Sequence, residues 1–313
     1  MTTNGTVPQP PPADWLDGPL APDAPADLAA RYDDVAAHLR VPFLGPFWRA
    51  LAWDQPRFAS LWQEIKPLLT HPAFEREAAS LRRAALIEEA VTMPSHQAFK
   101  ADMVRAEIDF EMRDRIGNYN AAVHYALPKT LLVAAWLLSP PVAGTPPAGP
   151  EDPIPTGIAP GAVPVPPAPP QQIRGRLAEL LDEIPRAHQH PIADEYFRAI
   201  GRMTDYLNAA WNALKPIVRD EPYDDRARTL VHHAQTAIHD LPPKLPTIDA
   251  ILSTNTTDDR YRSILTYFTH RHLPDILIDV AIVKGLTDGP DRAQDAPFDY
   301  LSPGPSPRRG GES

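Results

Sequence analysis

The sequence predicts an all-α fold. Apolar residues recur at the i, i+3, i+4, i+7 spacing of a helix face through most of the chain. Ala, Leu, Glu and Arg, which favour helices, dominate these stretches. No segment shows the alternation of apolar and polar residues that is typical of a half-buried strand. The 313 residues are 43% hydrophobic, which is enough for a substantial core.

The expected helices form two groups, one on either side of a proline-rich middle segment. In the first group the helical spacing covers residues 30–39, 47–52, 55–69 and 74–91. In the second group it covers residues 173–184, 195–206 and 207–218. The chain is therefore expected to contain two helical halves of similar size.

Proline marks the boundaries of these halves. The chain has 40 prolines, about 13% of its residues against a usual ~5%. Segments so rich in proline cannot offset the entropy of ordering and behave as extended linkers. The predicted organisation is a disordered arm (1–25), a first helical repeat (26–138), a proline-rich linker (139–172), a second repeat that carries the chemistry (173–286) and a flexible tail (287–313).

Composition excludes several classes of protein. The net charge is -10, so the basic surface that nucleic acid requires is not expected. The absence of cysteine excludes disulfides, Fe–S clusters, Cys-ligated zinc and a thiol nucleophile. No signal peptide or run of 18 apolar residues is found, and the apolar run 131–138 is too short to span a bilayer. We expect a soluble cytoplasmic protein without a membrane or nucleic-acid partner.

The two halves resemble each other. Displacing the first half by 149 residues aligns residues 31–67 with 180–216, and a displacement of 146 aligns a His-x-x-Leu-Pro motif. The identical pairs are Asp33/Asp182, Pro42/Pro191, Arg49/Arg198, Ala50/Ala199, Trp62/Trp211, Lys66/Lys215, Pro67/Pro216 and His124/His270. We interpret this similarity as a duplicated helical unit that packs as an intramolecular pseudo-dimer, joined by the proline-rich linker.

A duplication is informative where its copies differ, because one-sided chemistry needs residues that the other copy lacks. Asp194 and Asn208 stand where the first half has Gly45 and Ala59. Pro191 suits the first turn of a helix, which places Asp194 where the helix dipole favours its ionised form. Such a carboxylate can act as general base or nucleophile, and an Asn amide can hold a water or a substrate oxygen. The structural alternative is that Asp194 only caps a helix.

The repeated motifs resemble those of a known family. VPFLGPFWRAL…LWQEIKP and HPIADEYFRAI…DYLNAAWNALKP, with their connector, are similar to the group I 2-haloacid dehalogenases over residues 30–285. The resemblance implies an all-helical pseudo-dimer that hydrolyses short 2-haloalkanoic acids without a cofactor. It also implies direct attack by an Asp-activated water, with inversion and without a covalent ester. Asp194 matches the catalytic Asp, and Asn208 matches a second polar residue that bears on the accepted enantiomer. Ala193 stands where the family is expected to have Ser, which bears on water placement and carboxylate binding.

Such a reaction needs a dry cradle for the halogen and a receptor for the carboxylate. Aromatic edges tolerate a leaving halide, and backbone N–H groups at a helix start bind anions. Phe47, Trp48, Tyr196 and Phe197 are aromatic candidates, although helix packing also explains them. The predicted substrate-binding residues are Phe47, Trp48, Ala193, Asn120 and Tyr267.

Other kinds of site are less well supported. The pairs His188/His190, His232/His233 and His270/His272 have spacings that point side chains apart on a helix, so no metal site is expected. No glycine-rich nucleotide motif or G-x-S-x-G motif occurs. A non-catalytic helical ligand-binding or interaction protein, or a hydrolase of another small carboxylate, remains an alternative. The expected partner is a small 2-halocarboxylate, and the chain is expected to be a monomer or homodimer.

Overall fold

The computed structural model of the chain describes residues 9–16, 18, 23–138, 152–241 and 256–299. These residues form helices and loops, and no strand occurs among them, which confirms the all-α prediction. The first half contains α1 (Ala13–Leu16), α2 (Ala26–Leu39), α3 (Pro46–Leu51), α4 (Gln55–Leu69), α5 (Pro72–Ala84), α6 (Met93–Arg105) and α7 (Phe110–Leu138). The second half contains α8 (Arg176–His188), α9 (Glu195–Ile200), α10 (Thr204–Leu214), α11 (Glu221–Ala237), α13 (Thr256–Tyr267) and α14 (Leu273–Asp288).

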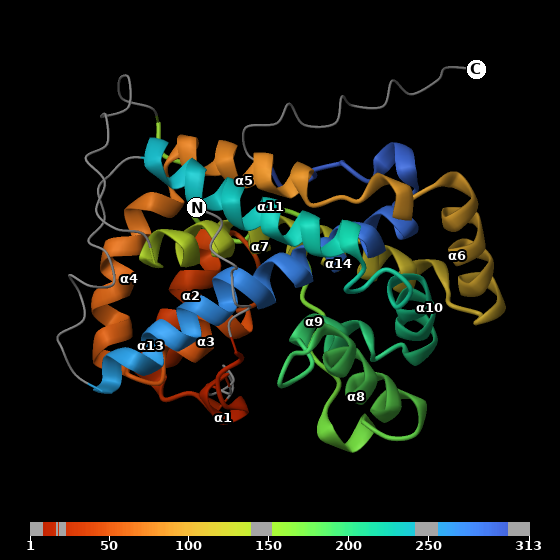
Figure 1. The fold of residues 1–313 in the computed structure, drawn as a ribbon, viewed down its shortest axis with the longest axis horizontal. Coiled ribbons are helices and arrows are strands. Elements are labelled where there is room, and N and C mark those ends of the chain that lie inside the picture. The colour runs from red at the N-terminus through yellow and green to blue at the C-terminus, as the bar shows by residue number, and fades with distance from the viewer. Residues whose placement is uncertain (1–8, 17, 19–22, 139–151, 242–255, 300–313) are drawn as a thin grey trace.

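Two long helices form the centre of the molecule. α7 packs along α14, while α5 and α11 lie side by side against α7 (Figure 1). By length and composition α7 could cross a membrane, but 89% of its most apolar window is buried inside the protein. This burial is the pattern of a core helix. One continuous hydrophobic cluster joins the two halves, so neither half forms a core of its own.

The short helices next to the core have definite starts. Pro46 opens α3 after Gly45, and Glu195 opens α9 after Asp194, whose side chain caps the helix. Asp194 is thus the cap residue of α9, one position before the first turn in which the sequence analysis placed it. Pro191 lies in the bend before α9 instead of in its first turn.

Two expected helices are interrupted. The helix predicted over residues 74–91 ends at Ala84 and gives way to a 3₁₀ turn, Glu88–Ala90. The helix predicted over 195–206 ends at Ile200, next to Gly201. Gly201 is poorly suited to a helix interior, and a Cβ at this position would lie 2.8 Å from the Phe197 carbonyl oxygen. A π-helical turn, Phe268–His272, joins α13 to α14.

Parts of the proline-rich segments are ordered against the core. Residues 139–151 lie outside the described residues, but 152–172 follow the surface through backbone hydrogen bonds. The Ile154 N–H donates to the Thr70 carbonyl (2.8 Å), and the Ala168 N–H donates to the Arg198 carbonyl (2.9 Å). Ile154 and Ala168 are buried. The expectation of a free linker is therefore corrected for this half, because these bonds and buried side chains offset the entropy of ordering.

The two ends of the chain are also partly ordered. In the arm expected to be disordered, α1 buries Leu16 against the core. In the expected flexible tail, Phe298 is buried and Asp299 forms an ion pair with Arg82. Residues 1–8 and 300–313 lie outside the described residues.

Candidate active site

A mostly apolar cavity of about 490 Å³ is lined by one of the two residue pairs at which the halves differ, Gly45 and Asp194. α3 and α7 line it from the first half, the start of α9 from the second, and linker residues 164–170 form one wall. Gly45 and Asp194 both line this cavity, and a Cβ at Gly45 would meet no atom within 4 Å. The missing side chain of Gly45 thus leaves open space in the same cavity as the carboxylate. This volume suits a small ligand.

The Asp194 carboxylate is held from two directions. One oxygen, Oδ1, accepts a hydrogen bond from the Tyr196 backbone N–H (2.6 Å), and Oδ2 lies 2.7 Å from Nε2 of His272. Burial favours the neutral acid, but His272 and the Tyr196 N–H outweigh it and lower the pKa of Asp194 below its usual 3.8. Asp194 is only 7% exposed, yet it borders the cavity. A helix cap and a buried ionised base are therefore combined in one group.

Arg49 places a buried positive charge on the same cavity. Its Nη2 forms an ion pair with Oε1 of Glu195 (2.8 Å), and the residue is 5% exposed. Within the described part of the chain, Nε and Nη1 have no hydrogen-bond partner. In the sequence Arg49 stood out only as one of the residues shared by the two halves, and nothing there indicated a position on the cavity. Unpaired buried N–H donors on a ligand-sized cavity are suited to an anionic ligand.

Aromatic rings form much of the remaining wall. Phe47 and Trp48, both predicted at the substrate, line the cavity and meet edge to face with ring centroids 5.2 Å apart. The indole N–H of Trp48 donates to Oγ1 of Thr130 (3.3 Å), which fixes the ring. Tyr119 stacks on Tyr196, and burial together with the nearby charge of Asp194 raises the pKa of Tyr119 well above 10. Both tyrosines therefore line the cavity with their hydroxyl groups protonated and uncharged.

The structure does not bring Asn208 to this cavity, which corrects its expected position beside Asp194. Asn208 faces outward from α10, and its Oδ1 accepts a hydrogen bond from Nε of Arg176 (2.9 Å). The sequence separation from Asp194 suggested a shared site, but the turn at Gly201–Met203 gives α10 its own direction. Its position lends no support to a catalytic role.

The other predicted residues lie behind the cavity wall. Asn120 is fully buried; its Oδ1 accepts from the Tyr196 hydroxyl (3.1 Å), and its Nδ2 donates to the Tyr206 hydroxyl (2.9 Å). Tyr267 also does not line the cavity and lies between two histidines. Ala193 precedes the capping Asp and is partly exposed, outside the lining. Direct contact of these three residues with a ligand in the cavity is therefore not supported.

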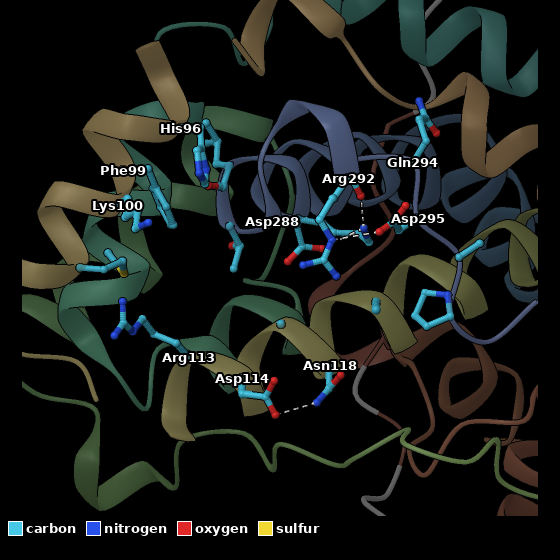
Figure 2. A pocket seen from close by; sticks show the side chains of 18 of the residues that line it. His96, Phe99, Lys100, Arg113, Asp114, Asn118, Asp288, Arg292, Gln294 and Asp295 are labelled. Atoms are coloured by element: carbon cyan, nitrogen blue, oxygen red, sulfur yellow. Dashed lines mark hydrogen bonds and ion pairs between the residues drawn. The ribbon is translucent and has the colours of Figure 1, made fainter. Parts of the chain in front are cut away.

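A second, larger cavity of about 990 Å³ lies between α6, α7 and residues 284–297 (Figure 2). It is lined by charged side chains, and several of them already have partners. Asn118 is bonded to Asp114 and Arg292 to Asp295, as Figure 2 shows. Asp194 is not among its lining residues. The smaller cavity is therefore the better candidate for chemistry.

Histidines and acids also gather behind Asp194, a cluster that the sequence analysis did not anticipate. His190 and His272 lie with ring centroids 5.0 Å apart, and His188 stacks on His190. Among the residues that the structure describes, no group of three or more His, Asp or Glu is arranged to hold a metal ion. The close spacing of these histidines was visible in the sequence, but the contact of Asp194 and His190 with the π-helical turn was not.

Comparison with known proteins agrees with this description. No family model matches the chain. The chain is 26% identical over 239 residues to an (R)-2-haloacid dehalogenase of Pseudomonas putida, covering 70% of this chain and 74% of that protein. It is 24% identical over 286 residues to a configuration-inverting 2-haloacid dehalogenase of Alcaligenes xylosoxydans xylosoxydans, covering 88% and 95%.

Solved structures show the same fold. A complex of a D-2-haloacid dehalogenase mutant with D-2-CPA matches with a TM-score of 0.76 at 22% identity, covering 90% of this chain and 98% of that one. The complex of a D-2-haloacid dehalogenase with L-LA matches with the same TM-score at 21% identity, covering 90% and 99%. The all-α fold of this chain is thus the fold of these solved dehalogenases. The family resemblance found in the sequence is confirmed, and the chain is a relative of these dehalogenases.

Proposed function

We propose that this chain hydrolyses short 2-haloalkanoic acids to 2-hydroxy acids. The single observation that carries the proposal is the buried, ionised Asp194 on an apolar cavity of about 490 Å³. The relatives named above act on 2-haloacids, and one of them is described as configuration-inverting. Asp194 serves as general base toward a water. The water oxygen forms a bond to C2, its proton passes to Asp194, and the carbon–halogen bond breaks on the opposite face, which inverts C2.

Arg49 is the proposed receptor for the substrate carboxylate. A second anion beside Asp194 is unfavourable in a buried site unless a cation balances it. Arg49 supplies that cation, and its Nε and Nη1 donors have no protein partner among the described residues. The pair with Glu195 fixes the guanidinium in place. This arrangement favours 2-halocarboxylates over neutral haloalkanes.

Phe47, Trp48 and the prolines of residues 164–170 are the proposed cradle for the halogen. All of them line the cavity and present apolar atoms or ring edges to it. The positive edges of aromatic rings stabilise the departing halide, so it requires little solvation by water. The linker then has a use beyond connection, because it closes one side of the site.

We also propose that the cavity arose at the interface of a duplicated unit, in a cytoplasmic enzyme. Several element positions support the duplication. α3 and α9 have six residues each and start 149 positions apart. The residues that end α2 and α8, Arg40 and Gln189, are both left-handed and are separated by the same 149 positions. The internal copy supplies the interface that a homodimer would otherwise provide.

Halide release tests the proposal. The purified chain is incubated with D- and with L-2-chloropropionate, and chloride and lactate are measured. We expect release from at least one enantiomer with inversion at C2. A single turnover in heavy-oxygen water should label the product, whereas an aspartyl ester would first deliver light oxygen from the enzyme. A well-folded chain that releases no halide from several 2-haloacids would favour the non-catalytic binding protein.

The carboxylate receptor has its own test. Arg49→Gln should raise KM for 2-chloropropionate by about 10- to 100-fold, because one charged hydrogen-bonding partner contributes roughly 1.5–3 kcal/mol. Arg198→Gln is measured in parallel, because Arg198 also lines the cavity and its Nε has no hydrogen-bond partner among the described residues, which makes it the rival receptor. Arg186→Gln is the control that should leave KM unchanged, since Arg186 is exposed, pairs with Asp182 and does not line the cavity. An unchanged KM in Arg49→Gln would assign the carboxylate to another group.

A further inference from the structure

A series of buried titratable side chains in close contact begins at Asp194, and the proposed attack does not use this series. Nε2 of His272 lies 2.7 Å from Oδ2 of Asp194. The Tyr267 hydroxyl lies 3.2 Å from Nδ1 of His272 and 2.9 Å from Nδ1 of His190. Nε2 of His190 lies 3.1 Å from Oδ2 of Asp275. All of these side chains are buried, so the series connects the carboxylates of Asp194 and Asp275 through the protein interior.

Counting the protons on His272, Tyr267 and His190 gives one positive charge for the three side chains together. The Tyr267 hydroxyl has one proton and can donate to only one of its two histidines, so the other must donate to it from Nδ1. Nε2 of His272 is hydrogen-bonded to Asp194, and Nε2 of His190 lies at ion-pair distance from Asp275 without a hydrogen bond, so a carboxylate favours a proton on each Nε2. One ring is therefore neutral and the other carries protons on both nitrogens. Each contact joins a proton donor to an acceptor in either arrangement, whether the imidazolium is His272 or His190.

The contacts of the two rings differ in a way that favours the charge beside Asp194 before the attack. The groups that face His190 are His188, Tyr267, His272, Arg219, Arg271 and Asp275. Burial and the neighbouring cations hold the pKa of His190 well below its usual 6.5. Asp275 is shared with Arg219, which weakens its pull on His190. The groups that face His272 are Asp194, Tyr267, His190 and the Phe268 ring, and Asp194 lies closest.

We propose that His272, Tyr267 and His190 form a proton relay that moves this charge when Asp194 accepts the proton of the attacking water. The Nδ1 proton of His272 passes to the Tyr267 oxygen while the Tyr267 proton passes to Nδ1 of His190. The relay itself gains and loses no proton, and the imidazolium comes to lie beside Asp275. The inference rests on the proposed function, because it needs a reaction that neutralises Asp194.

The relay reconciles two demands on one carboxylate. Asp194 must be ionised before the attack, and a cation beside it achieves this. The same cation opposes protonation during the attack, and it would be left buried without a counter-ion afterwards. Moving the charge to His190 removes this opposition as the proton arrives. His272, Tyr267 and His190 are thus positioning residues that act through Asp194.

The charge arrangement can be tested without turnover. Nitrogen-15 NMR of labelled histidines at pH 7 should show His272 protonated on both nitrogens and His190 protonated only on Nε2. In Asp194→Asn, where the residue still caps α9, His272 should lose one proton. A neutral His272 in the unaltered protein, or a His272 that keeps both protons in Asp194→Asn, would overturn the proposal.

Transfer through Tyr267 is tested by turnover. Tyr267→Phe should lower kcat by about 10- to 100-fold, below the ~10²–10⁴ of a complete proton-transfer step, with little change in KM. The dependence of kcat on the fraction of heavy water should change from curved to linear, because fewer protons then move together. The matched control is Tyr223→Phe, a buried tyrosine of the same cluster that bonds Asp279.

Curvature that persists in Tyr267→Phe, or an equal loss of kcat in Tyr223→Phe, would show that the hydroxyl has a structural role only and would refute the relay. Failure of the proposed function is a different result. If the unaltered chain releases no halide, the dehalogenase reaction and the transfer step are both refuted, while the NMR result still decides where the charge resides.

Discussion

Asp194 both caps α9 and is the proposed base, and two substitutions separate these roles. Asn keeps an oxygen that can accept from the Tyr196 N–H, whereas Ala cannot. Both variants lose the charged contact with His272, so that loss cancels when they are compared. Losing a Ser, Thr, Asp or Asn cap costs about 0.5–2 kcal/mol, and we expect Asp194→Ala to be less stable than Asp194→Asn by that amount.

Activity should not follow this difference in stability. Both variants lack the base, so halide release should fall by at least the ~10²–10⁴ of general-base catalysis in each. Unfolding in urea and chloride release are measured on the same preparations. The matched control is Asp220→Ala, because Asp220 caps α11 in the same way, accepting from the Tyr223 N–H at 2.9 Å. It should lose similar stability and keep full activity. Substantial halide release by Asp194→Asn would refute Asp194 as the base.

Three further predictions concern pH and stability. The native pKa of Asp194 is lowered, so its stabilisation is complete above the unfolded value near 3.8 and is lost as pH falls through the native pKa. The difference in unfolding free energy between the unaltered protein and Asp194→Asn should therefore shrink as pH falls through that range. Glu75→Gln should cost about 3–5 kcal/mol in urea unfolding, because it leaves the buried charge of Lys129 without the counter-ion that lies 2.7 Å away. Replacing both residues by apolar ones should cost far less. Gly201→Ala should lower the free energy of unfolding by about 1–3 kcal/mol, since its Cβ would lie 2.7 Å from Leu177. In Gly45→Ala the added Cβ meets no atom within 4 Å, so the loss should be under about 1 kcal/mol. Thermal or urea unfolding measures both.

The sequence was informative where local patterns decide the structure. The helix expected over residues 55–69 is α4, with the same bounds, because periodicity, an Asp54 cap and a proline at the start all agree. The helix expected over 195–206 is interrupted at Gly201, a residue poorly suited to a helix interior. This local signal was visible in the sequence, but the periodic spacing on either side of it concealed the break. The packing of Gly201 against Leu177 of α8 is tertiary, and no local pattern encodes it.

The site was predicted in part for the same reason. Comparing the two halves singled out Asp194 and Gly45, since a difference between copies can be read without knowing how they pack. The direction of Asn208 and the role of Arg49 depend on which helices are neighbours. The contact of His272 with Asp194 depends on the π-helical turn, which shifts the faces of the α13–α14 segment. Periodicity alone gives no register for such a contact.

The cap position itself explains how a buried acid can be tolerated here. A carboxylate taken out of water needs partners for its lone pairs, or it becomes protonated. A residue at the start of a helix obtains one partner from the backbone, and in α9 this is the Tyr196 N–H. The start of α3 in the first half has Gly45 at the cap position, which needs no such partner and leaves its space to the cavity. The Gly-to-Asp difference between the starts of α3 and α9, together with the contact from His272, therefore places one charged carboxylate on one side of an apolar cavity.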